Sequence, residues 1–393
     1  MSIKLRVLHL ATGNLYGGVE TMLTTFARHR ADWGGLDFQF AVCFEGRLKE
    51  ELLRAKMPVH PLRPVRVRNP LSIWRARRDL TALLDREPFD VAVTHSPWSQ
   101  IVLGPAVRRR GLPLVYWQHD VMTGRHWLEK LARRVRPDLV IVNSDFTATT
   151  TDHLYPNEPR QVVHCPVTAP AALPDADARQ ALRAELHCSP SETVIIQVSR
   201  LEEMKGHRTL LTALGRMKAI PGWACWMVGG AQRPHEVAYR AQLESLAERE
   251  GIRNRVRFLG QRSDVPRLLA AADVFCQTNL GPESFGLTFI EALYAQLPVV
   301  TTALGGACEI INDTCGALVP PNDPVAVANA LERLVRDPAQ RARLGANGPP
   351  RARHLCDPPT QLGKLTTALE LLLGRESAKH PPATSRTPAP PTP

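Results

Sequence analysis

Short apolar runs alternate with amphipathic segments along this chain. Ten runs are typical of strands, and most are continuously apolar, which favours parallel strands buried on both faces. They lie at 6–10, 38–44, 91–94, 114–117, 139–142, 194–198, 223–228, 256–259, 274–277 and 299–302. Between them are helix patterns, as in 18–29, where Met22, Leu23 and Phe26 share one face. Two series of strand–helix units predict an α/β protein with two doubly wound parallel-sheet domains.

The domain boundary is visible in the composition. Residues 168–177 are rich in Pro and Ala, and the periodic pattern restarts after them. We therefore expect an N-terminal domain at 1–170 and a C-terminal domain at 171–355, in keeping with a length of 393 residues. The apolar helical pattern near the end predicts a C-terminal helix within 356–375 that packs back on the first domain. Residues 376–393 are rich in Pro and Thr and are predicted to be disordered.

Several features bear on the compartment. No apolar run reaches the length of a membrane-spanning helix, and the first ten residues lack the features of a secretory signal. The eight cysteines form no C-x-x-C pair and no zinc spacing, and several lie in apolar runs. These features predict a cytoplasmic protein with reduced cysteines.

The net charge of +11 is uneven, since residues 1–170 carry 24 Lys and Arg against 16 Asp and Glu. One interpretation is a solvated surface. The other is attraction of this basic half to an anionic membrane face or an acidic acceptor, which would place the protein peripherally at the inner face of the cell membrane. Nucleic acid is not an expected partner, because no binding motif accompanies the charge. The basic positions are Arg63, Arg66, Arg68, Arg75, Arg77, Arg78, Arg108, Arg109, Arg110, Arg133, Arg134 and Arg136.

The strongest chemical signal is the segment 281–293, which follows an apolar strand and opens a helix near Leu287. A glycine-containing turn into a helix exposes free N–H groups, and the helix dipole favours an anion there. Glu283 in the loop and Glu291 in the helix are expected to face one crevice, where carboxylates suit sugar and ribose hydroxyls. Alternatively, Glu291 caps the helix or forms a surface salt bridge.

A second signal is the segment 199–207, which also joins a strand to a helix. Arg200 and Lys205 are placed to converge near the start of that helix, where a guanidinium and an ammonium can clamp a diphosphate. Two solvated cations are the alternative. The position favours the clamp, because ligands bind at the carboxyl ends of strands in open α/β sheets.

Weaker candidates follow other strands. Gly17 and Gly18 allow close backbone approach to a ligand, although a plain tight turn explains them equally well. His119 ends the strand at 114–117 in a polar cluster, and a structural histidine is the alternative. His95 and Asn143 end neighbouring strands in the same way. Asp175 and Asp177 match the D-x-D pattern of metal-dependent sugar transfer, but they lie in the Pro/Ala linker with no strand before them. We interpret that match as chance and expect no metal site.

Together these segments resemble the retaining GT-B-fold glycosyltransferases of family 4. Glu283 and Glu291 fall on the family's E-x7-E motif, and Arg200 and Lys205 fall on its S-R-x4-K-G pattern. The segments 305–311 and 316–324 are similar to its G-G-x-x-E-I and G-x-L-V-P-P-x-D-P stretches. Met204, Cys308 and the Arg-rich segment 63–78 depart from the family pattern. The resemblance implies two Rossmann-like domains that face a central cleft.

The resemblance also implies roles. The C-terminal domain would bind a nucleoside-diphosphate sugar and the N-terminal domain a saccharide or lipid-linked acceptor. Arg200 and Lys205 would hold the diphosphate, Glu283 the donor sugar and Glu291 the ribose, while His119 would lie near the transferred sugar. Further contacts would come from the acceptor or phosphate loop and from two donor-binding segments. These comprise Gly17, Gly18, Gly260, Gln261, Arg262, Ser284, Phe285, Gly286 and Leu287.

The expected activity is metal-independent transfer of a hexosyl unit with retention of configuration, without a cofactor, in synthesis of a cell-surface polysaccharide or lipopolysaccharide. Two alternatives remain within this fold: a sugar-nucleotide epimerase or phosphorylase, and a non-catalytic subunit that binds nucleotide sugars. A phosphorylase would need a lysine for pyridoxal phosphate, and the sequence offers no evident site. The intact set of two acids and two cations argues against the non-catalytic subunit.

Overall fold

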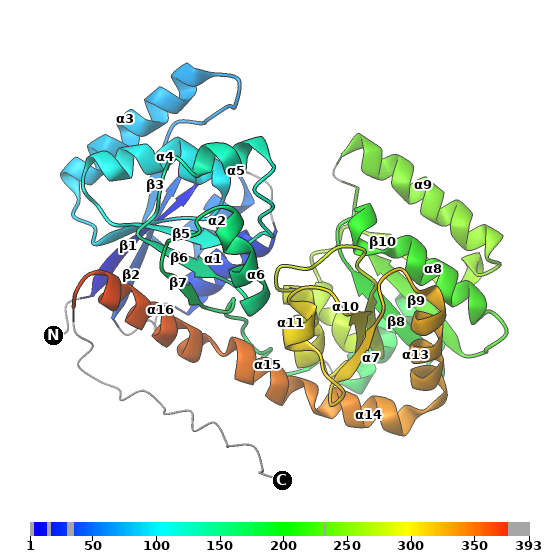
Figure 1. Ribbon diagram of the computed structural model, residues 1–393. Coiled ribbons are helices and arrows are strands. Elements are labelled where there is room, and N and C mark those ends of the chain that lie inside the picture. The colour runs from blue at the N-terminus through cyan, green and yellow to red at the C-terminus, as the bar shows by residue number, and fades with distance from the viewer. Residues whose placement is uncertain (1–3, 14–16, 30–34, 174, 232, 376–393) are drawn as a thin grey trace, which may run out of the picture.

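The computed structural model describes residues 4–13, 17–29, 35–173, 175–231 and 233–375. These residues form two parallel sheets, each covered by helices on both faces and each belonging to its own half of the molecule (Figure 1). The first sheet has strand order β3-β2-β1-β4-β5-β6-β7 and the second β10-β9-β8-β11-β12-β13. Both orders reverse beside the first strand of the domain, which is the topological switch point where open α/β sheets bind ligands.

The elements of the first domain span residues 5–162. They are β1 (Leu5–Ala11), α1 (Gly18–Arg28), β2 (Leu36–Val42), α2 (Arg47–Arg54), β3 (Val59–Pro61), α3 (Pro70–Arg86), β4 (Val91–Thr94), α4 (Pro97–Arg109), β5 (Leu114–Gln118), α5 (Trp127–Ala132), β6 (Leu139–Val142), α6 (Asp145–Thr150) and β7 (Arg160–Val162).

The second domain repeats this alternation. It contains α7 (Ala176–Glu185), β8 (Thr193–Val198), a 3₁₀ turn (Glu203–Lys205), α8 (His207–Arg216), β9 (Trp223–Val228), α9 (Pro234–Arg249), β10 (Val256–Gly260), α10 (Val265–Ala271), β11 (Val274–Gln277), α11 (Leu287–Tyr294), β12 (Val299–Thr302), α12 (Ala307–Ile310), β13 (Gly316–Val319), α13 (Pro324–Arg336), α14 (Pro338–Ala346) and α15 (Gly348–Cys356).

The prediction of two doubly wound parallel-sheet domains is confirmed. All ten predicted strands are present, with ends that differ by no more than two residues. The sequence pattern missed β3, β7 and β13, which are outer strands of three or four residues. An edge strand is buried less completely, so it does not need the continuous apolar run that marks a central strand.

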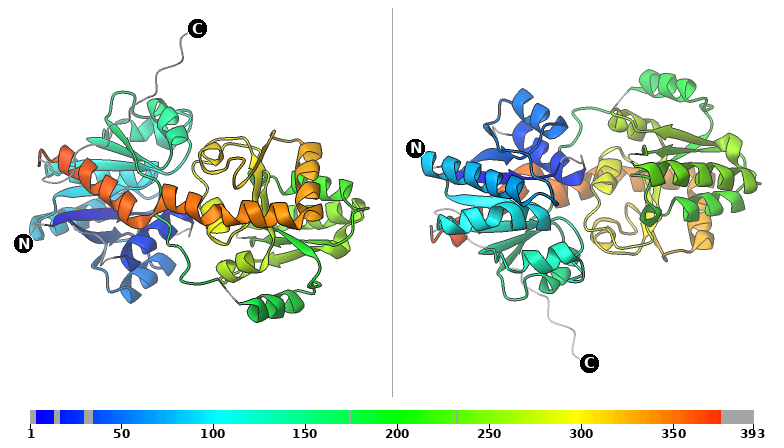
Figure 2. Two further views of the ribbon diagram at one scale, coloured as in Figure 1. Left: turned by 90° about the horizontal axis from the view of Figure 1, so that it is seen from below. Right: turned by 90° about the horizontal axis from the view of Figure 1, so that it is seen from above.

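The last helix returns to the first domain. After α15 packs beside α11, α16 (Pro358–Leu372) lies along the N-terminal half (Figure 2). Its buried Leu362, Leu365 and Leu369 belong to an apolar core shared with β1 and β2, and Arg375 pairs with Asp90. None of the helices in the described ranges has the length and apolar content that a bilayer crossing needs. The predicted disordered tail, 376–393, lies outside the described residues.

We predict that Leu369→Ala destabilises the protein by about 2–5 kcal/mol, because it removes a fully buried side chain between α16 and the first domain. Urea unfolding provides the measurement. Leu371→Ala is the matched control, since Leu371 is 70% exposed on the same helix, and it should change stability by less than about 0.5 kcal/mol. Equal effects of the two substitutions would contradict the packing of α16.

Candidate active site

A cleft between the two domains collects loops from the carboxyl ends of strands in both sheets. A cavity of about 430 Å³ opens there. Gly17, Gly18 and Asp120 line it from the first domain, and Arg200 and Arg233 line it from the second. Residues that the sequence pattern places after separate strands therefore share one crevice, because parallel strands end at the same edge of a sheet.

Lys205 and Glu283 form an ion pair in this region. Lys205 ends the 3₁₀ turn after β8, and Glu283 lies in the loop after β11, the strand that pairs with β8. The Lys205 Nζ is 2.7 Å from Glu283 Oε2. The side-chain amide of Asn279 also donates to this oxygen at 3.0 Å, and that of Gln277 lies at 3.5 Å. The carboxylate is thus held by a cation and two amides, of which the sequence pattern identified only the cation.

Two glycines bring these loops into contact. Gly206 has a positive φ of 71°, and a Cβ there would overlap the carbonyl oxygen of Thr278. In return, the Thr278 hydroxyl donates to the Gly206 carbonyl at 2.7 Å. Gly305, with φ of 64°, follows β12, and a Cβ there would lie 2.3 Å from the carbonyl oxygen of Glu283. A side chain at Gly206 would push the turn of Lys205 away from the end of β11, and a side chain at Gly305 would displace the backbone of Glu283.

Arg200 and Asp120 face each other across the cleft. The Arg200 guanidinium pairs with Glu202 at 2.6 Å and lines the cleft cavity, whereas Lys205 pairs with Glu283, so the two predicted cations are held by different carboxylates. Asp120 is open to the cleft but crowded by both domains, and this partial desolvation raises its pKa. Glu283 adds to that effect, whereas Arg200 and Lys205 oppose it. These interactions make Asp120 part of the same electrostatic cluster.

Glu291 lies beside a second cavity of about 430 Å³, located between α1, the interdomain linker, α10 and α11. Thr21, Thr25 and Arg28 line it from α1, and Leu287 and Glu291 line it from α11. Within the described residues, the Glu291 carboxylate has no hydrogen-bond or ion-pair partner, so the expected alternatives of a cap or a salt bridge do not occur. Burial raises its pKa to about 7.

The two cavities meet near Gly18. A Cβ on Gly18 would lie 3.3 Å from Cδ1 of Leu287, the first residue of α11. Gly18 lines the cleft cavity, and Leu287 lines the cavity of Glu291. The structure therefore brings the glycine turn after β1 and the start of α11 together.

The other predicted donor-binding residues lie elsewhere. Gly260 ends β10, Gln261 packs against Gly230, and Arg262 makes two 2.8 Å hydrogen bonds to Asp264. None of these three lines either cavity, whereas Pro266 and Arg267 of α10 line the second one. Gly286, with φ of 109°, is the N-cap of α11.

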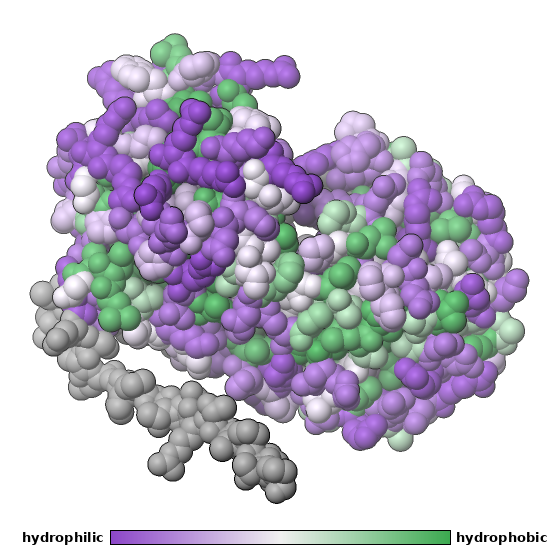
Figure 3. All heavy atoms as spheres, in the orientation of Figure 1, coloured by the Kyte–Doolittle hydropathy of each residue, from purple (hydrophilic) through white to green (hydrophobic). Residues whose placement is uncertain are grey.

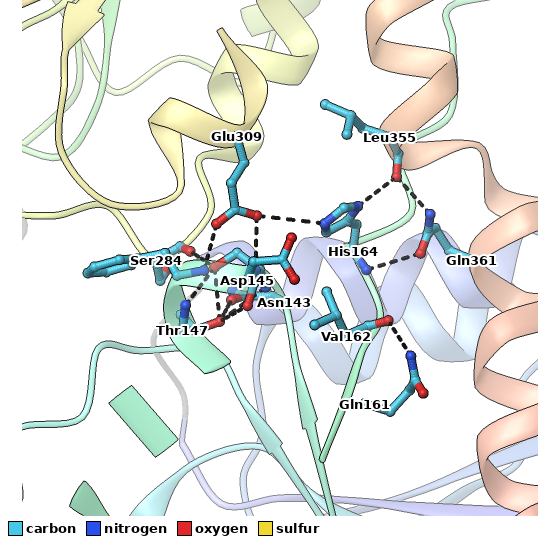
Figure 4. A network of polar contacts seen from close by, with 12 residues as sticks. Asn143, Asp145, Thr147, Gln161, Val162, His164, Ser284, Glu309, Leu355 and Gln361 are labelled. Carbon is cyan, nitrogen blue, oxygen red and sulfur yellow. Dashed lines mark hydrogen bonds and ion pairs between the residues drawn. The ribbon is translucent and has the colours of Figure 1, made fainter. Parts of the chain in front are cut away.

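Ser284 contacts the first domain (Figure 4), and so does Phe285. The Ser144 hydroxyl donates to the Ser284 carbonyl at 2.5 Å. The buried Phe285 ring stacks on His164, which follows β7, with ring centroids 5.2 Å apart. These contacts make the loop after Glu283 part of the interface between the domains.

Glu309 completes that interface (Figure 4). Its carboxylate accepts the backbone N–H groups of Asp145 at 2.9 Å and Phe146 at 2.6 Å, in the first turn of α6. Burial raises the pKa of Glu309, and the two N–H groups oppose that rise. In the sequence, Glu309 stands out only as one position of the G-G-x-x-E-I stretch. Nothing local in the sequence shows that it caps a helix of the other domain.

His119 is buried at the end of β5, and its Nε2 lies 3.0 Å from Nδ1 of His95. Asp175 of the D-x-D match accepts the N–H of Ala178 as the N-cap of α7. In the described ranges no three His, Cys, Asp or Glu side chains are arranged to hold a metal ion.

Two Rossmann-like domains that meet at a cleft, with an ion pair and a helix start on one wall, define the architecture of a GT-B glycosyltransferase. Comparison with known families agrees with this class. The family described as "Glycosyl transferases group 1" matches residues 178–351, and "Glycosyltransferase Family 4" matches residues 16–169. The chain belongs to glycosyltransferase family 4, and it is an enzyme that transfers glycosyl groups.

Individual relatives share about a quarter to two fifths of their aligned residues with this chain. The lipopolysaccharide core biosynthesis mannosyltransferase LpsB of Rhizobium meliloti is 27% identical over 71% of this chain and 73% of its own length. A phosphatidyl-myo-inositol mannosyltransferase of Mycobacterium leprae is 38% identical, over 37% of this chain and 38% of its own. Among solved structures, Anabaena Alr3699/HepE in complex with UDP has a TM-score of 0.82 at 24% identity, covering 93% of this chain and all of that one.

The raised pKa of Glu291 gives a prediction about pH. The folded carboxyl keeps its proton up to pH about 7, whereas its ordinary pKa is 4.5. Between these values the folded protein binds more protons than the unfolded chain, so its stability falls as pH rises. Glu291→Gln removes this loss, and we expect it to raise the Tm relative to the natural protein at pH 8 but not at pH 4.5.

Thermal unfolding at the two pH values is the measurement. The exposed Glu248 of α9 supplies the control, and Glu248→Gln should leave the Tm difference independent of pH. A Glu291→Gln effect that is equal at both pH values would show that the carboxyl ionises normally in the folded protein.

Proposed function

We propose that this enzyme moves a hexosyl unit from a nucleoside-diphosphate sugar to a saccharide or lipid-linked acceptor, with retention of configuration and without a metal ion. The observation that carries the proposal is the ion pair beside the interdomain cleft between Lys205, in the turn after β8, and Glu283, in the loop that leads into α11. It supplies one cation for a phosphate and one carboxylate for sugar hydroxyls within a single contact.

The diphosphate would lie between Lys205, Arg200 and the N-terminus of α11. These groups offer two positive charges and free backbone N–H groups. In the structure, Lys205 forms an ion pair with Glu283, and Arg200 forms one with Glu202. A bound diphosphate would form ion pairs with both cations in place of these carboxylates. Glu283 would then be able to accept hydrogen bonds from the hydroxyl groups of the sugar.

The chemical step then needs charge stabilisation at the leaving group. The bond between the anomeric carbon and the phosphate oxygen breaks, and the diphosphate keeps the electron pair. The acceptor oxygen bonds to the same face of the anomeric carbon, and its proton passes to the departing phosphate oxygen. Lys205 and Arg200 would stabilise the growing negative charge in place of a divalent cation.

The nucleoside would occupy the cavity beside Glu291. The Glu291 carboxylate has no hydrogen-bond or ion-pair partner in the described structure, and it can accept hydrogen bonds from the two ribose hydroxyls. The HepE structures in complex with UDP and with UDP-glucose support a nucleotide-sugar donor. LpsB, a lipopolysaccharide core mannosyltransferase, supports a role in cell-surface polysaccharide or lipopolysaccharide synthesis.

We also propose that α3 binds the inner face of an anionic membrane. Much of the basic charge of the first domain is already paired, since Arg63, Arg108, Arg110 and Arg136 each bind a carboxylate. Such pairs are typical of a solvated surface.

The outer face of α3 differs. Leu71, Trp74, Arg75 and Arg78 recur at helical spacing and are exposed, and neither arginine pairs with a carboxylate in the described structure. Figure 3 shows mainly hydrophilic residues over this end of the molecule, with hydrophobic atoms among them. Exposed apolar side chains beside unpaired arginines suit the headgroup region of an anionic bilayer.

We expect Lys205→Ala and Glu283→Ala each to lower turnover by about two orders of magnitude, the scale for loss of one preorganised electrostatic group. The measurement is release of nucleoside diphosphate from whichever UDP-, GDP- or ADP-sugar raises the Tm of the natural protein. Lys218→Ala is the control, because Lys218 is exposed after α8. Turnover near that of the natural enzyme in both site variants would refute the assignment.

The same assay tests the other parts of the proposal. Activity should persist in EDTA, and NMR of the product should show the anomeric configuration of the donor sugar. Loss of activity in EDTA, or an inverted product, would overturn metal independence or retention without touching the assignment of Lys205 and Glu283.

For the membrane, Arg75→Gln with Arg78→Gln should weaken binding to phosphatidylglycerol vesicles at least tenfold, given about 1 kcal/mol per basic residue near an anionic surface. Sedimentation with vesicles is the measurement. The matched control is Arg333→Gln with Arg343→Gln, which removes the same charge from exposed positions of the second domain. Binding that survives high salt unchanged, or that both double variants weaken equally, would contradict the role of α3.

A further inference from the structure

Three buried histidines form a hydrogen-bonded chain across the first sheet. His9 lies in β1, His95 follows β4 and His119 follows β5, and these strands are neighbours in the order β1-β4-β5. His9 Nδ1 is 2.9 Å from His95 Nε2, and His95 Nδ1 is 3.0 Å from His119 Nε2. The successive rings are stacked, with centroids 5.1 Å and 5.3 Å apart.

The ends of this chain lie in different surroundings. His9 is fully buried among the rings of Phe26, Phe38 and Phe40, with centroids 4.9–6.0 Å away. Its Nε2 is enclosed and has no hydrogen-bond partner. At the other end, Nδ1 of His119 has no partner among the described residues either, but it is not among the enclosed polar atoms. His119 directly precedes Asp120 in the chain, and both Asp120 and His95 line the cleft cavity.

The three imidazoles are neutral near pH 7. Burial lowers the pKa of His9 and of His119 to about 3, and that of His95 well below its ordinary value. Each ring therefore carries a single N–H group, on one of its two nitrogens.

Two arrangements of the three protons satisfy both hydrogen bonds. In the first, each ring carries its proton on Nδ1, so that His9 donates to His95, His95 donates to His119, and the third N–H is that of His119 Nδ1, at the end of the chain that is not enclosed among the phenylalanine rings. In the second, each proton is on Nε2, so that both hydrogen bonds reverse and the third N–H is enclosed among phenylalanine rings. A buried N–H without an acceptor is rarer in proteins than a buried acceptor without a donor, and the first arrangement avoids it.

We propose that His9 and His95 are positioning residues that hold His119 as the Nδ1–H tautomer. His119 then presents a hydrogen-bond donor to the cleft. It suits an oxygen of the bound sugar and, in this state, cannot take the proton of the acceptor hydroxyl. The inference depends on the proposed binding of substrate in the cleft for its catalytic meaning, but the tautomer is a property of the ligand-free protein.

The first test is therefore made without substrate. NMR of the protein labelled with ¹⁵N in its 13 histidines distinguishes the two tautomers by the shifts of protonated and bare ring nitrogens, and His119→Gln identifies the signals of His119. We expect His119 to be protonated at Nδ1. Protonation at Nε2 would overturn the inference whatever the enzyme's donor.

The second test alters the far end of the chain. His9→Leu removes the donor to His95, whereas His9→Asn keeps an N–H near the position of Nδ1. We expect the leucine variant to shift His119 toward the Nε2–H tautomer and to lower kcat/KM roughly tenfold, the scale of one lost hydrogen bond. The asparagine variant should retain the tautomer and most of the activity. His354→Gln, at an exposed position of α15, is the control.

Equal losses in the leucine and asparagine variants with an unchanged His119 signal would show that His9 only fills space and would overturn its positioning role. If His9→Leu fails to fold, two measurements still test the inference. They are the tautomer of His119 in the natural protein and the activity of His9→Asn compared with that of His354→Gln. Failure of the proposed donor chemistry would appear differently, as an intact tautomer in a protein that binds no nucleotide sugar.

Discussion

The capping of α6 by Glu309 is the contact on which the geometry of the cleft depends. The cation–carboxylate pair belongs to one domain and the histidine chain to the other, and no sheet hydrogen bond joins the two sheets in the described structure. Their relative position must come from contacts at the interface and at the two chain crossings. A carboxylate that accepts two N–H groups at a helix start is a charge-assisted contact, stronger than a neutral hydrogen bond and restricted in direction.

This contact is linked to the candidate site through the backbone. Gly306, three residues before Glu309, donates its N–H to the Glu283 carbonyl at 2.8 Å. Glu283 in turn binds Lys205, and the turn after Lys205 is locked to Thr278. One continuous set of contacts therefore runs from the first turn of α6 to the loop after β8. Because only two loops connect these contacts, a displacement of either domain at α6 would also move the Lys205–Glu283 ion pair.

The two sheets could be predicted from the sequence more fully than the interface between the domains. Central strands such as β8 and β11 need continuous apolar runs, and Lys205 and Glu283 follow them at motif spacing, so both could be predicted as site residues. Their pairing could not, because the sequence pattern grouped Lys205 with Arg200 and Glu283 with Glu291, whereas Glu291 lies at a separate cavity. Ser284 and Phe285 lie in the same motif, but their contacts depend on which surface of the other domain faces them. The histidine chain is hidden for a related reason: His9 sits inside an apolar strand and reads as core until the strand order places it beside His95.

The chain crosses between the domains twice, and the two crossing segments lie side by side. The linker passes through His164 and Val167, and the return to the first domain follows Cys356. Val167 donates its N–H to the Cys356 carbonyl at 3.0 Å, and His164 Nδ1 lies 3.1 Å from the Leu355 carbonyl. The His164 ring also stacks on Phe285, two residues after Glu283. Because both crossings are bonded to each other there, rotation about them would separate Glu309 from α6 and His164 from Phe285 before it disturbed either sheet. The angle between the domains and the conformation of the loop that carries Glu283 are therefore coupled by the same few contacts.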